Sequence, residues 1–416
     1  MQREFELGAE GLLADPDLAG LGGRRGRARR ARGRPPGGQR ALDGPQRAGP
    51  RGAGPDRAGQ QGHRRRAPGA PAGRDGQGRH GRRPRGRRGA GRDQGPGAAL
   101  AAEPAPDRGA GLARGLDPLR GQRVKLGTVE ARDGTAIAYR DEGSGPALVF
   151  TSGYTSSDFY WERLLPRFRG RARLITWDLK GHGRSEPARD LSAVTVEDSV
   201  DDLRRVLDAC EVERGTLLAF SLGCQVILEA WRHLPERITG MVPMLGTYER
   251  PFDNLLSPKL GPRLFSVFRR VGPVIGGSAL KAGWLNSRLP GSFRLNQRLG
   301  LVGGLLDRAD MEPFFAHMKR VHGKTWAHMG IAAQEHSAGD LLPEIGVPTL
   351  VVAGGKDTFT PMRLSLDMAE QIPAAELLYL PEATHTGLLE FPEEIAERLD
   401  RFLSEHGLVV ADDPAS

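Results

Sequence analysis

The chain has 416 residues, a formal net charge of +9 and two cysteines, Cys210 and Cys224. Two cysteines cannot build a disulfide framework, and no apolar run reaches the roughly 20 residues that a membrane-spanning helix needs. The first 20 residues are acidic and do not resemble a secretory signal. These features disfavour a disulfide-rich secreted domain and an integral membrane protein, and they predict a soluble protein of the cytoplasm.

Residues 21–100 differ from the rest of the chain in composition. They contain 22 arginines, 22 glycines and four acidic residues, and they lack valine, isoleucine, phenylalanine, tyrosine and tryptophan. This stretch therefore carries a net charge of +18, while everything outside it sums to −9. Because so little apolar surface cannot offset the entropy of ordering a chain, we predict that residues 1–123 form a low-complexity tail that is disordered or a mis-assigned start.

Two interpretations of the tail stay open. An arginine-rich arm can bind RNA or DNA through phosphate contacts, which would make the chain a nucleic-acid-binding protein. Against this, no aromatic residue is interleaved to stack on bases. The abundant residue types also have codons rich in G and C, which favours translation of DNA upstream of the true start. Val124, which opens the run VKLGTVEARDG, is then a plausible beginning of the protein.

From Val124 onward, short apolar segments alternate with helical patterns. Helices are indicated by apolar residues from Val196 to Cys210 at spacings of three and four, by the run that starts at Ser221, and over 393–405. Eight strands are predicted, at 124–131, 135–141, 147–152, 173–177, 215–220, 239–244, 348–353 and 376–380. The alternation is typical of an α/β fold with a mostly parallel eight-stranded sheet and helices on both faces.

Residues 248–338 interrupt this alternation. Apolar residues from Leu260 to Ile275 follow helical spacing, and glycine-rich joints separate the pieces. We predict a helical cap here, inserted between two parts of the α/β core, 124–247 and 339–416. The leucine, phenylalanine and valine content of the cap favours an apolar acyl or alcohol group in the substrate, although core packing also explains much of it.

One predicted cap helix combines basic and apolar side chains. Arginines flank the apolar residues in this helix: Arg263, Arg269 and Arg270 lie beside Leu264, Phe265 and Phe268. Such a combination would let the cap rest on an anionic membrane surface.

The run LLAFSLGCQVIL places a serine between an apolar strand and a helix. Its centre reads Ala219-Phe220-Ser221-Leu222-Gly223. Small neighbours are needed around such a serine because the sharp turn crowds the backbone, and alanine meets that need nearly as well as glycine. The pattern resembles the nucleophile elbow G-x-S-x-G of the α/β-hydrolase family, with alanine in place of the first glycine.

The resemblance implies an acid and then a histidine later in the chain. Asp357 follows the predicted strand PTLVVAGG, and His385 follows ELLYLPEA. In such a triad the histidine takes the proton of the serine hydroxyl, and the carboxylate orients the imidazole. We therefore predict Ser221 as nucleophile, His385 as base and Asp357 as acid. Glu249, after the sixth predicted strand, is a second candidate for the acid and ranks below Asp357.

The same resemblance implies an oxyanion hole made of two backbone N–H groups. One belongs to Leu222, and the other is assigned to Tyr154, in the loop after the third predicted strand. The segment DLKGHGRS (178–185) resembles the D-x-x-G-x-G-x-S turn of the family. We interpret its histidine, His182, as a loop residue and not as a base, and Cys224 as a packing residue.

Together these residues predict hydrolysis of a carboxylic ester through an acyl-enzyme on Ser221. A serine in the nucleophile position, where an aspartate would otherwise stand, disfavours haloalkane dehalogenase and epoxide hydrolase activities. Thioester hydrolysis, lactone opening, carbon–carbon hydrolysis and cofactor-free haloperoxidation stay open, as does a non-catalytic binding protein of the same fold. We expect a small apolar acyl or ester substrate, no cofactor and no metal.

Overall fold

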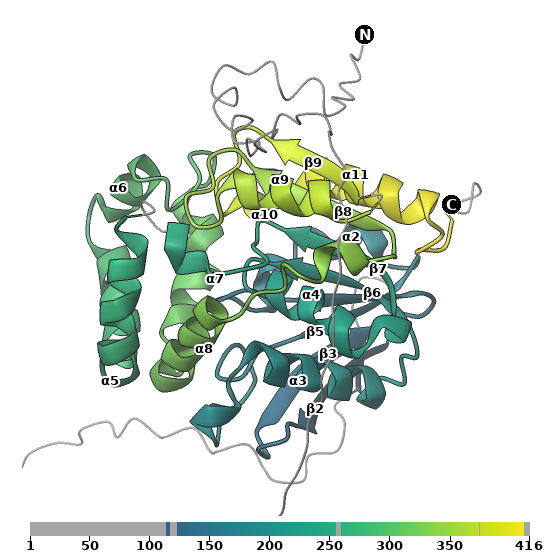
Figure 1. Ribbon diagram of the computed structural model, residues 1–416, viewed down its shortest axis with the longest axis horizontal. Coiled ribbons are helices and arrows are strands. Elements are labelled where there is room, and N and C mark those ends of the chain that lie inside the picture. The colour runs from purple at the N-terminus through teal and green to yellow at the C-terminus, as the bar shows by residue number, and fades with distance from the viewer. Residues whose placement is uncertain (1–113, 117–122, 255–258, 374, 412–416) are drawn as a thin grey trace, which may run out of the picture. The chain divides into compact units, whose positions relative to one another are not determined.

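A mostly parallel sheet forms the centre of the computed structural model (Figure 1), which describes residues 114–116, 123–254, 259–373 and 375–411. The eight predicted strands are present: β2 (Arg123–Glu130), β3 (Ala136–Glu142), β4 (Ala147–Thr151), β5 (Arg173–Trp177), β6 (Gly215–Phe220), β7 (Ile238–Met244), β8 (Thr349–Gly354) and β9 (Ala375–Leu380). Their order is β2-β3-β5-β4-β6-β7-β8-β9. From β5 to β9 in this order all neighbours are parallel, and β2 and β3 extend the sheet antiparallel.

A ninth strand, β1 (Arg114–Leu116), extends the sheet beyond the prediction. It pairs antiparallel with β2, with Gly115 opposite Val124. This short strand falls inside the range 1–123 that the sequence assigned to the tail, so part of that range belongs to the sheet. The other tail predictions, disorder and nucleic-acid binding, concern residues that lie outside the described part of the chain.

Helices cover both faces of the sheet, as predicted. One face packs against α3 (Val196–Ala209), α4 (Gly223–His233) and α9 (Met362–Gln371), and the other against α2 (Leu165–Phe168) and α11 (Pro392–Glu405). Successive strand residues point to opposite faces: Val149 of β4 belongs to the first core cluster, and Leu148 and Phe150 belong to the second. Every residue of β4, β6 and β8 is buried, which explains their continuous apolar sequences.

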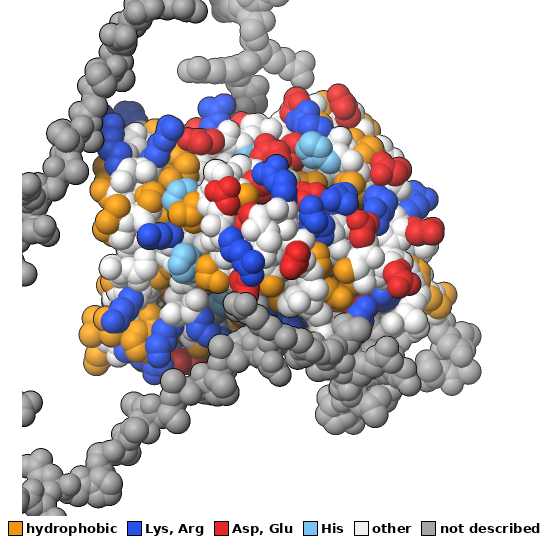
Figure 2. Space-filling model, turned by 90° about the horizontal axis from the view of Figure 1, so that it is seen from below, with side chains coloured by type: hydrophobic (Ala, Val, Ile, Leu, Met, Phe, Trp, Pro, Cys, Tyr) orange, Lys and Arg blue, Asp and Glu red, His pale blue; other side chains and the backbone are white. Residues whose placement is uncertain are grey.

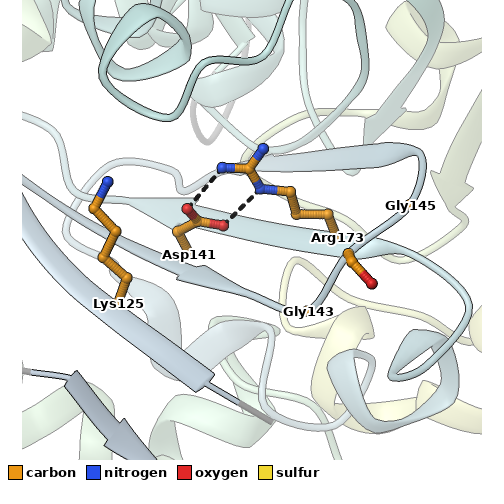
Figure 3. Close-up of a pocket in the computed structure, with 6 residues that line it drawn as sticks. Lys125, Asp141, Gly143, Gly145 and Arg173 are labelled. Carbon is orange, nitrogen blue, oxygen red and sulfur yellow. Dashed lines mark hydrogen bonds and ion pairs between the residues drawn. The ribbon is translucent and has the colours of Figure 1, made fainter.

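An ion pair joins the neighbouring strands β3 and β5 (Figure 3). Arg173 donates from Nε and Nη2 to the two carboxylate oxygens of Asp141, each at 2.8 Å, which is a bidentate geometry. A hollow of about 270 Å³ lies beside this pair, with Lys125 and Gly143 in its lining. Asp141 and Arg173 already form hydrogen bonds with each other. We therefore interpret their ion pair as a structural link between β3 and β5 and not as a binding site for a ligand.

The interval 248–338, predicted to be a cap and called the cap below, contains helices that lie together at one side of the sheet (Figure 1). They are η4 (Pro251–Asn254), α5 (Gly261–Arg288), α6 (Ser292–Arg298), α7 (Arg308–Met318) and α8 (Gly323–Glu335). Helices α5 and α8 approach closely through glycines, since a Cβ on Gly276 would lie 2.3 Å from the carbonyl oxygen of Gly323. Among the described residues, no helix combines the length and the hydropathy required to cross a lipid bilayer.

Candidate active site

Ser221 occupies a sharp turn between β6 and α4. Its φ is +54°, in the left-handed region that non-glycine residues rarely adopt, and its N–H donates to the carbonyl oxygen of Met244 at 3.1 Å. The turn requires glycines nearby: a Cβ on Gly153 would lie 2.7 Å from Cβ of Ser221, and one on Gly223 would lie 2.5 Å from the oxygen of Thr151. The strained backbone presents the hydroxyl at the carboxyl end of the sheet.

The structure brings the three predicted triad residues together. Nε2 of His385 lies 2.9 Å from Oγ of Ser221, and Nδ1 of the same ring lies 2.8 Å from Oδ2 of Asp357. The carboxylate of Asp357 is fully buried, whereas the imidazole is 16% exposed toward the site. This arrangement can move a proton from the serine hydroxyl to the imidazole while the carboxylate holds the ring.

Asp357 is fixed by donors on its own loop. Oδ1 accepts hydrogen bonds from the N–H groups of Phe359 and Thr360, each at 2.8 Å, and Oδ2 lies 2.8 Å from the hydroxyl of Thr360. These bonds hold the carboxylate so that Oδ2 faces Nδ1 of His385. The alternative acid, Glu249, lies instead in a β-bridge with Ser337. The geometry therefore favours Asp357 for this role.

Leu222 and Tyr154, the two predicted oxyanion donors, have backbone N–H groups that remain available. Leu222 precedes the first turn of α4, where N–H groups have no partner within the helix. Over the residues that the structure describes, neither N–H donates to a protein acceptor. The residue after Tyr154, Thr155, has a φ of +61°. Donors held this way stay free for the charge that develops on a carbonyl oxygen.

His182 supports the loop that carries Tyr154. Its Nε2 accepts a hydrogen bond from the N–H of Thr155 at 3.2 Å, and its Nδ1 lies 3.0 Å from the carbonyl oxygen of Lys180. Burial lowers the pKa of His182 to about 4, so the ring stays neutral and can accept this bond. The sequence interpretation of His182 as a loop residue did not foresee this contact, although the D-x-x-G-x-G-x-S turn marked the segment.

The cap reaches the same loop through Trp326 of α8. The hydroxyl of Tyr154 donates to the carbonyl oxygen of Trp326 at 2.9 Å, and Nε1 of Trp326 donates to Oγ1 of Thr155 at 2.8 Å. The rings of Tyr154 and Trp326 stack with centroids 5.1 Å apart. Sequence reasoning missed Trp326, because 171 residues separate it from Thr155 and no local pattern reports such a contact.

Residues 146–392, more than half of the chain, match the model of a family described as the alpha/beta hydrolase fold. The chain belongs to the α/β-hydrolase fold family. It is 25% identical over 271 residues to a pimeloyl-[acyl-carrier protein] methyl ester esterase of Photobacterium profundum, which covers 65% of this chain and 99% of that protein. These similarities confirm the predicted family and the prediction of an enzyme of hydrolase type.

Solved structures give the same family relationship. A hydrolase from Pseudomonas aeruginosa superposes with a TM-score of 0.55 and 26% identity, covering 67% of this chain and 98% of that one. An esterase from Exiguobacterium antarcticum has a TM-score of 0.55 at 20% identity, with the same coverage, and shows the fold alone. The α/β-hydrolase architecture predicted from the elbow is therefore confirmed.

A cavity of about 350 Å³ lies between the α/β-hydrolase core and the helices of the cap. Ser221 and His385 line it from the core side. Aromatic side chains make up much of the remaining wall: Tyr160, Phe252, Phe268, Phe314, Trp326 and Phe359. Among the described residues that line the cavity, none is an Asp, Glu, Lys or Arg. A neutral, apolar group therefore fits this cavity better than a charged one, since a charge would lose its hydration there.

One set of side chains among the described residues has the spacing of metal ligands. Glu197, Glu229 and His336 offer ligand atoms that lie within 4.8 Å of one another. Glu229, however, already bonds to Nε of Arg232 at 2.9 Å and to Nε2 of His336 at 3.1 Å. The contacts between α4 and the end of α8 account for the proximity of Glu229 and His336, and the predicted triad lies elsewhere, at the ends of β6, β8 and β9.

Proposed function

We propose that the protein is a serine hydrolase that cleaves an uncharged carboxylic ester through an acyl-enzyme on Ser221. The observation that carries this proposal is the chain of contacts from Ser221 Oγ to His385 Nε2 at 2.9 Å and from His385 Nδ1 to Asp357 Oδ2 at 2.8 Å. A serine hydroxyl is a weak nucleophile until a base takes its proton. Family membership and relatives named esterases support the same reaction class.

The proposed reaction has two halves. Oγ of Ser221 bonds to the ester carbonyl carbon as its proton passes to Nε2 of His385, and the N–H groups of Leu222 and Tyr154 stabilise the oxyanion. The carbon–oxygen bond to the alcohol then breaks, and the imidazolium returns its proton to the departing alkoxide. A water molecule attacks the acyl-enzyme with His385 again as base, which releases the carboxylic acid and restores the serine hydroxyl.

The cavity supports an apolar substrate of modest size. Its volume of about 350 Å³ is at the lower end of the range typical of small-molecule sites, and the described residues of its aromatic wall include no charged side chain. Ester hydrolysis of a compact, neutral molecule fits this lining. Lactone opening, thioester hydrolysis, carbon–carbon bond hydrolysis and haloperoxidation use the same kind of triad. The substrate panel below separates ester cleavage from the cleavage of lactones and thioesters.

A fluorophosphonate probe tests the nucleophile directly. We expect the probe to label the wild-type protein once, and the Ser221→Ala variant not at all. The matched control is Ser278→Ala, which removes an exposed serine of α5 and should leave labelling unchanged. Labelling that persists in Ser221→Ala would refute the proposal. Hydrolysis rates for esters, lactones and thioesters of graded acyl length would then identify the substrate class.

A further inference from the structure

Helix α5 of the cap turns large aliphatic side chains toward the outside of the molecule. Leu260, at its N-cap, and Leu264, Val267, Val271 and Val274 recur at spacings of four and three, so they form a single stripe. Their side chains are 37% to 83% exposed, with Val274 the most exposed. A helix that packs on a protein core normally has the opposite distribution, with its apolar stripe buried.

Small residues lie on the inward face of α5 where this helix crosses α8, and Leu280 is buried farther along the helix. Gly272 and Gly276 are buried on this face, and Gly276 lies against Gly323 of α8 so closely that any Cβ would clash. Contact between α5 and α8 therefore depends on glycines at this crossing and not on the aliphatic stripe. We call the stripe from Leu260 to Val274, with the basic residues on its flank, the α5 outer face. This face contributes little to the fold of the cap.

The stretch of sequence that contains α5 and α6 carries charge of one sign, although Arg269 and Arg288 pair with Glu335 and Glu312 of neighbouring helices. Residues 259–306 include eight lysines and arginines and no acidic residue, and all eight basic side chains are exposed. At about 100° per residue, Arg263, Arg270 and Lys281 lie along one flank of the stripe. None of these three forms an ion pair with another described residue. Figure 2 shows hydrophobic and basic side chains side by side along its left edge, the side on which α5 lies in Figure 1.

We propose that the α5 outer face docks the protein on an anionic lipid surface. Aliphatic side chains in a row, flanked by cations that form no ion pair with another described residue, match a helix that lies in the plane of a bilayer interface. The stripe from Leu260 to Val274 spans about 21 Å at 1.5 Å per residue. A second copy of the chain fits this face less well, because two identical cationic faces would repel each other.

Docking at this face would bring the lipid surface close to the substrate cavity. Phe268 of α5 lines that cavity and contacts the ring of Trp326, with centroids 5.4 Å apart. The same helix therefore carries the docking stripe on one side and part of the cavity wall on the other. Delivery of apolar esters from the lipid rests on the proposed function, whereas docking itself does not need the Ser221 chemistry.

An environment-sensitive fluorophore at position 274 tests the docking. Val274→Cys can be labelled selectively, because Cys210 and Cys224 are buried. We expect a blue shift and an intensity increase on vesicles of phosphatidylcholine with phosphatidylglycerol, and little change on phosphatidylcholine alone. The same label at Glu236→Cys, in the turn before β7, should respond to neither. This pair of sites matters because the basic tail can tether the protein to anionic vesicles without burying position 274.

Charge reversal provides the matched comparison. Arg263→Glu with Arg270→Glu should weaken vesicle partitioning reported by position 274 at least about tenfold. The control variant, Arg214→Glu with Arg401→Glu, replaces two exposed arginines that belong to the α/β core. It changes the net charge by the same amount and should retain the fluorescence response at position 274. Equal responses at positions 236 and 274, or no effect of the cap reversal, would overturn docking by α5. So would a fluorescence change without vesicles that accompanies dimerisation.

Loss of activity alone leaves the docking inference standing. We expect Ser221→Ala to bind anionic vesicles as the wild type does while it no longer reacts with fluorophosphonate. Normal docking with an unreactive wild-type serine would refute the proposed function only. Normal serine reactivity with no insertion of position 274 would refute the docking only.

Discussion

The core and the cap hold their parts of the site in different ways. In the core, backbone N–H groups fix the reacting side chains: Asp357 accepts two of them, and the amide of Ser221 is itself bound to Met244. In the cap, aromatic rings line the cavity, and Trp326 bonds to the loop of Tyr154. We infer that core residues set the rate for every substrate, while cap residues select among substrates, except where Trp326 connects the two regions.

The largest expected effect is that of Asp357→Asn, in the core. Its side chain should favour the wrong imidazole tautomer of His385, so we expect kcat to fall about 10⁴-fold for all esters with little change in KM. Steady-state kinetics over several acyl lengths would measure this. Glu249→Gln is the matched control and should retain activity. A severe loss in the control together with a mild one in Asp357→Asn would move the acid role to Glu249.

The chemistry of the core could be predicted from the sequence because its strands are buried on both faces. β6 and β8 therefore appear as continuous apolar runs, and the residue that follows each run occupies the same edge of the sheet. Ser221 follows β6 directly and Asp357 lies in the loop after β8, and the resemblance to the nucleophile elbow and its triad order predicted their roles. β1 was missed because its three residues, Arg114–Leu116, carry no pattern of their own and are strand only by pairing with β2.

The contacts between core and cap could not be predicted in this way. Trp326 and Thr155 are 171 residues apart, and His182 and Thr155 are 27 apart, so no local spacing reports them. Helix α5 shows a second limit. Its apolar period was predicted, but a period of three and four does not say whether the stripe faces the protein or the solvent. In the structure the aliphatic residues from Leu260 to Val274 face outward, because glycines occupy the contact with α8.

A buried histidine at the interface between core and cap should make the stability of the protein depend on pH. His317, at the end of α7, is 1% exposed, and its ring lies 6.0 Å from that of His182 in the core. Burial is the largest cause that lowers the pKa of His317, and together with smaller contributions from His182 and Arg320 it brings this pKa to about 3. The unfolded chain binds this proton near pH 6.5, so His317 makes the folded state lose stability as the pH falls below that value.

His317→Gln should remove this contribution. We expect the free energy of unfolding of the variant, minus that of the wild type, to increase by roughly 3 kcal/mol as the pH falls from 7.5 to 4.5. Each pH unit between the two pKa values of His317 corresponds to about 1.4 kcal/mol. Urea unfolding of both proteins at the two pH values measures the difference. Parallel pH dependences would show that His317 is protonated as readily in the folded protein as in the unfolded chain.

Gly330→Ala tests whether the cap can disturb the core from a distance. A Cβ at position 330 would lie 2.6 Å from the hydroxyl oxygen of Tyr154, so Tyr154 and its loop must shift. Because misplacement of a catalytic group by about 1 Å can cost up to about 100-fold in rate, we expect kcat to fall within that range. Gly277→Ala is the matched control, since a Cβ there meets nothing within 4 Å. Equal activities of the Gly330→Ala and Gly277→Ala variants would show that a change in the cap does not disturb catalysis in the core.

The smallest expected effect distinguishes positioning from pocket shape. Trp326→Phe keeps a six-membered aromatic ring beside Tyr154 and the backbone oxygen that Tyr154 binds, and it removes the N–H that donates to Thr155 together with the five-membered ring that carries it. One neutral hydrogen bond corresponds to roughly a fivefold change, and we expect kcat to fall by that factor for every acyl length. Phe268→Leu, which alters the cavity wall next to Trp326, should instead change KM according to acyl length. If Trp326→Phe also changes only the acyl-length preference, the tryptophan shapes the pocket and does not position the oxyanion loop, and the division between core and cap is complete.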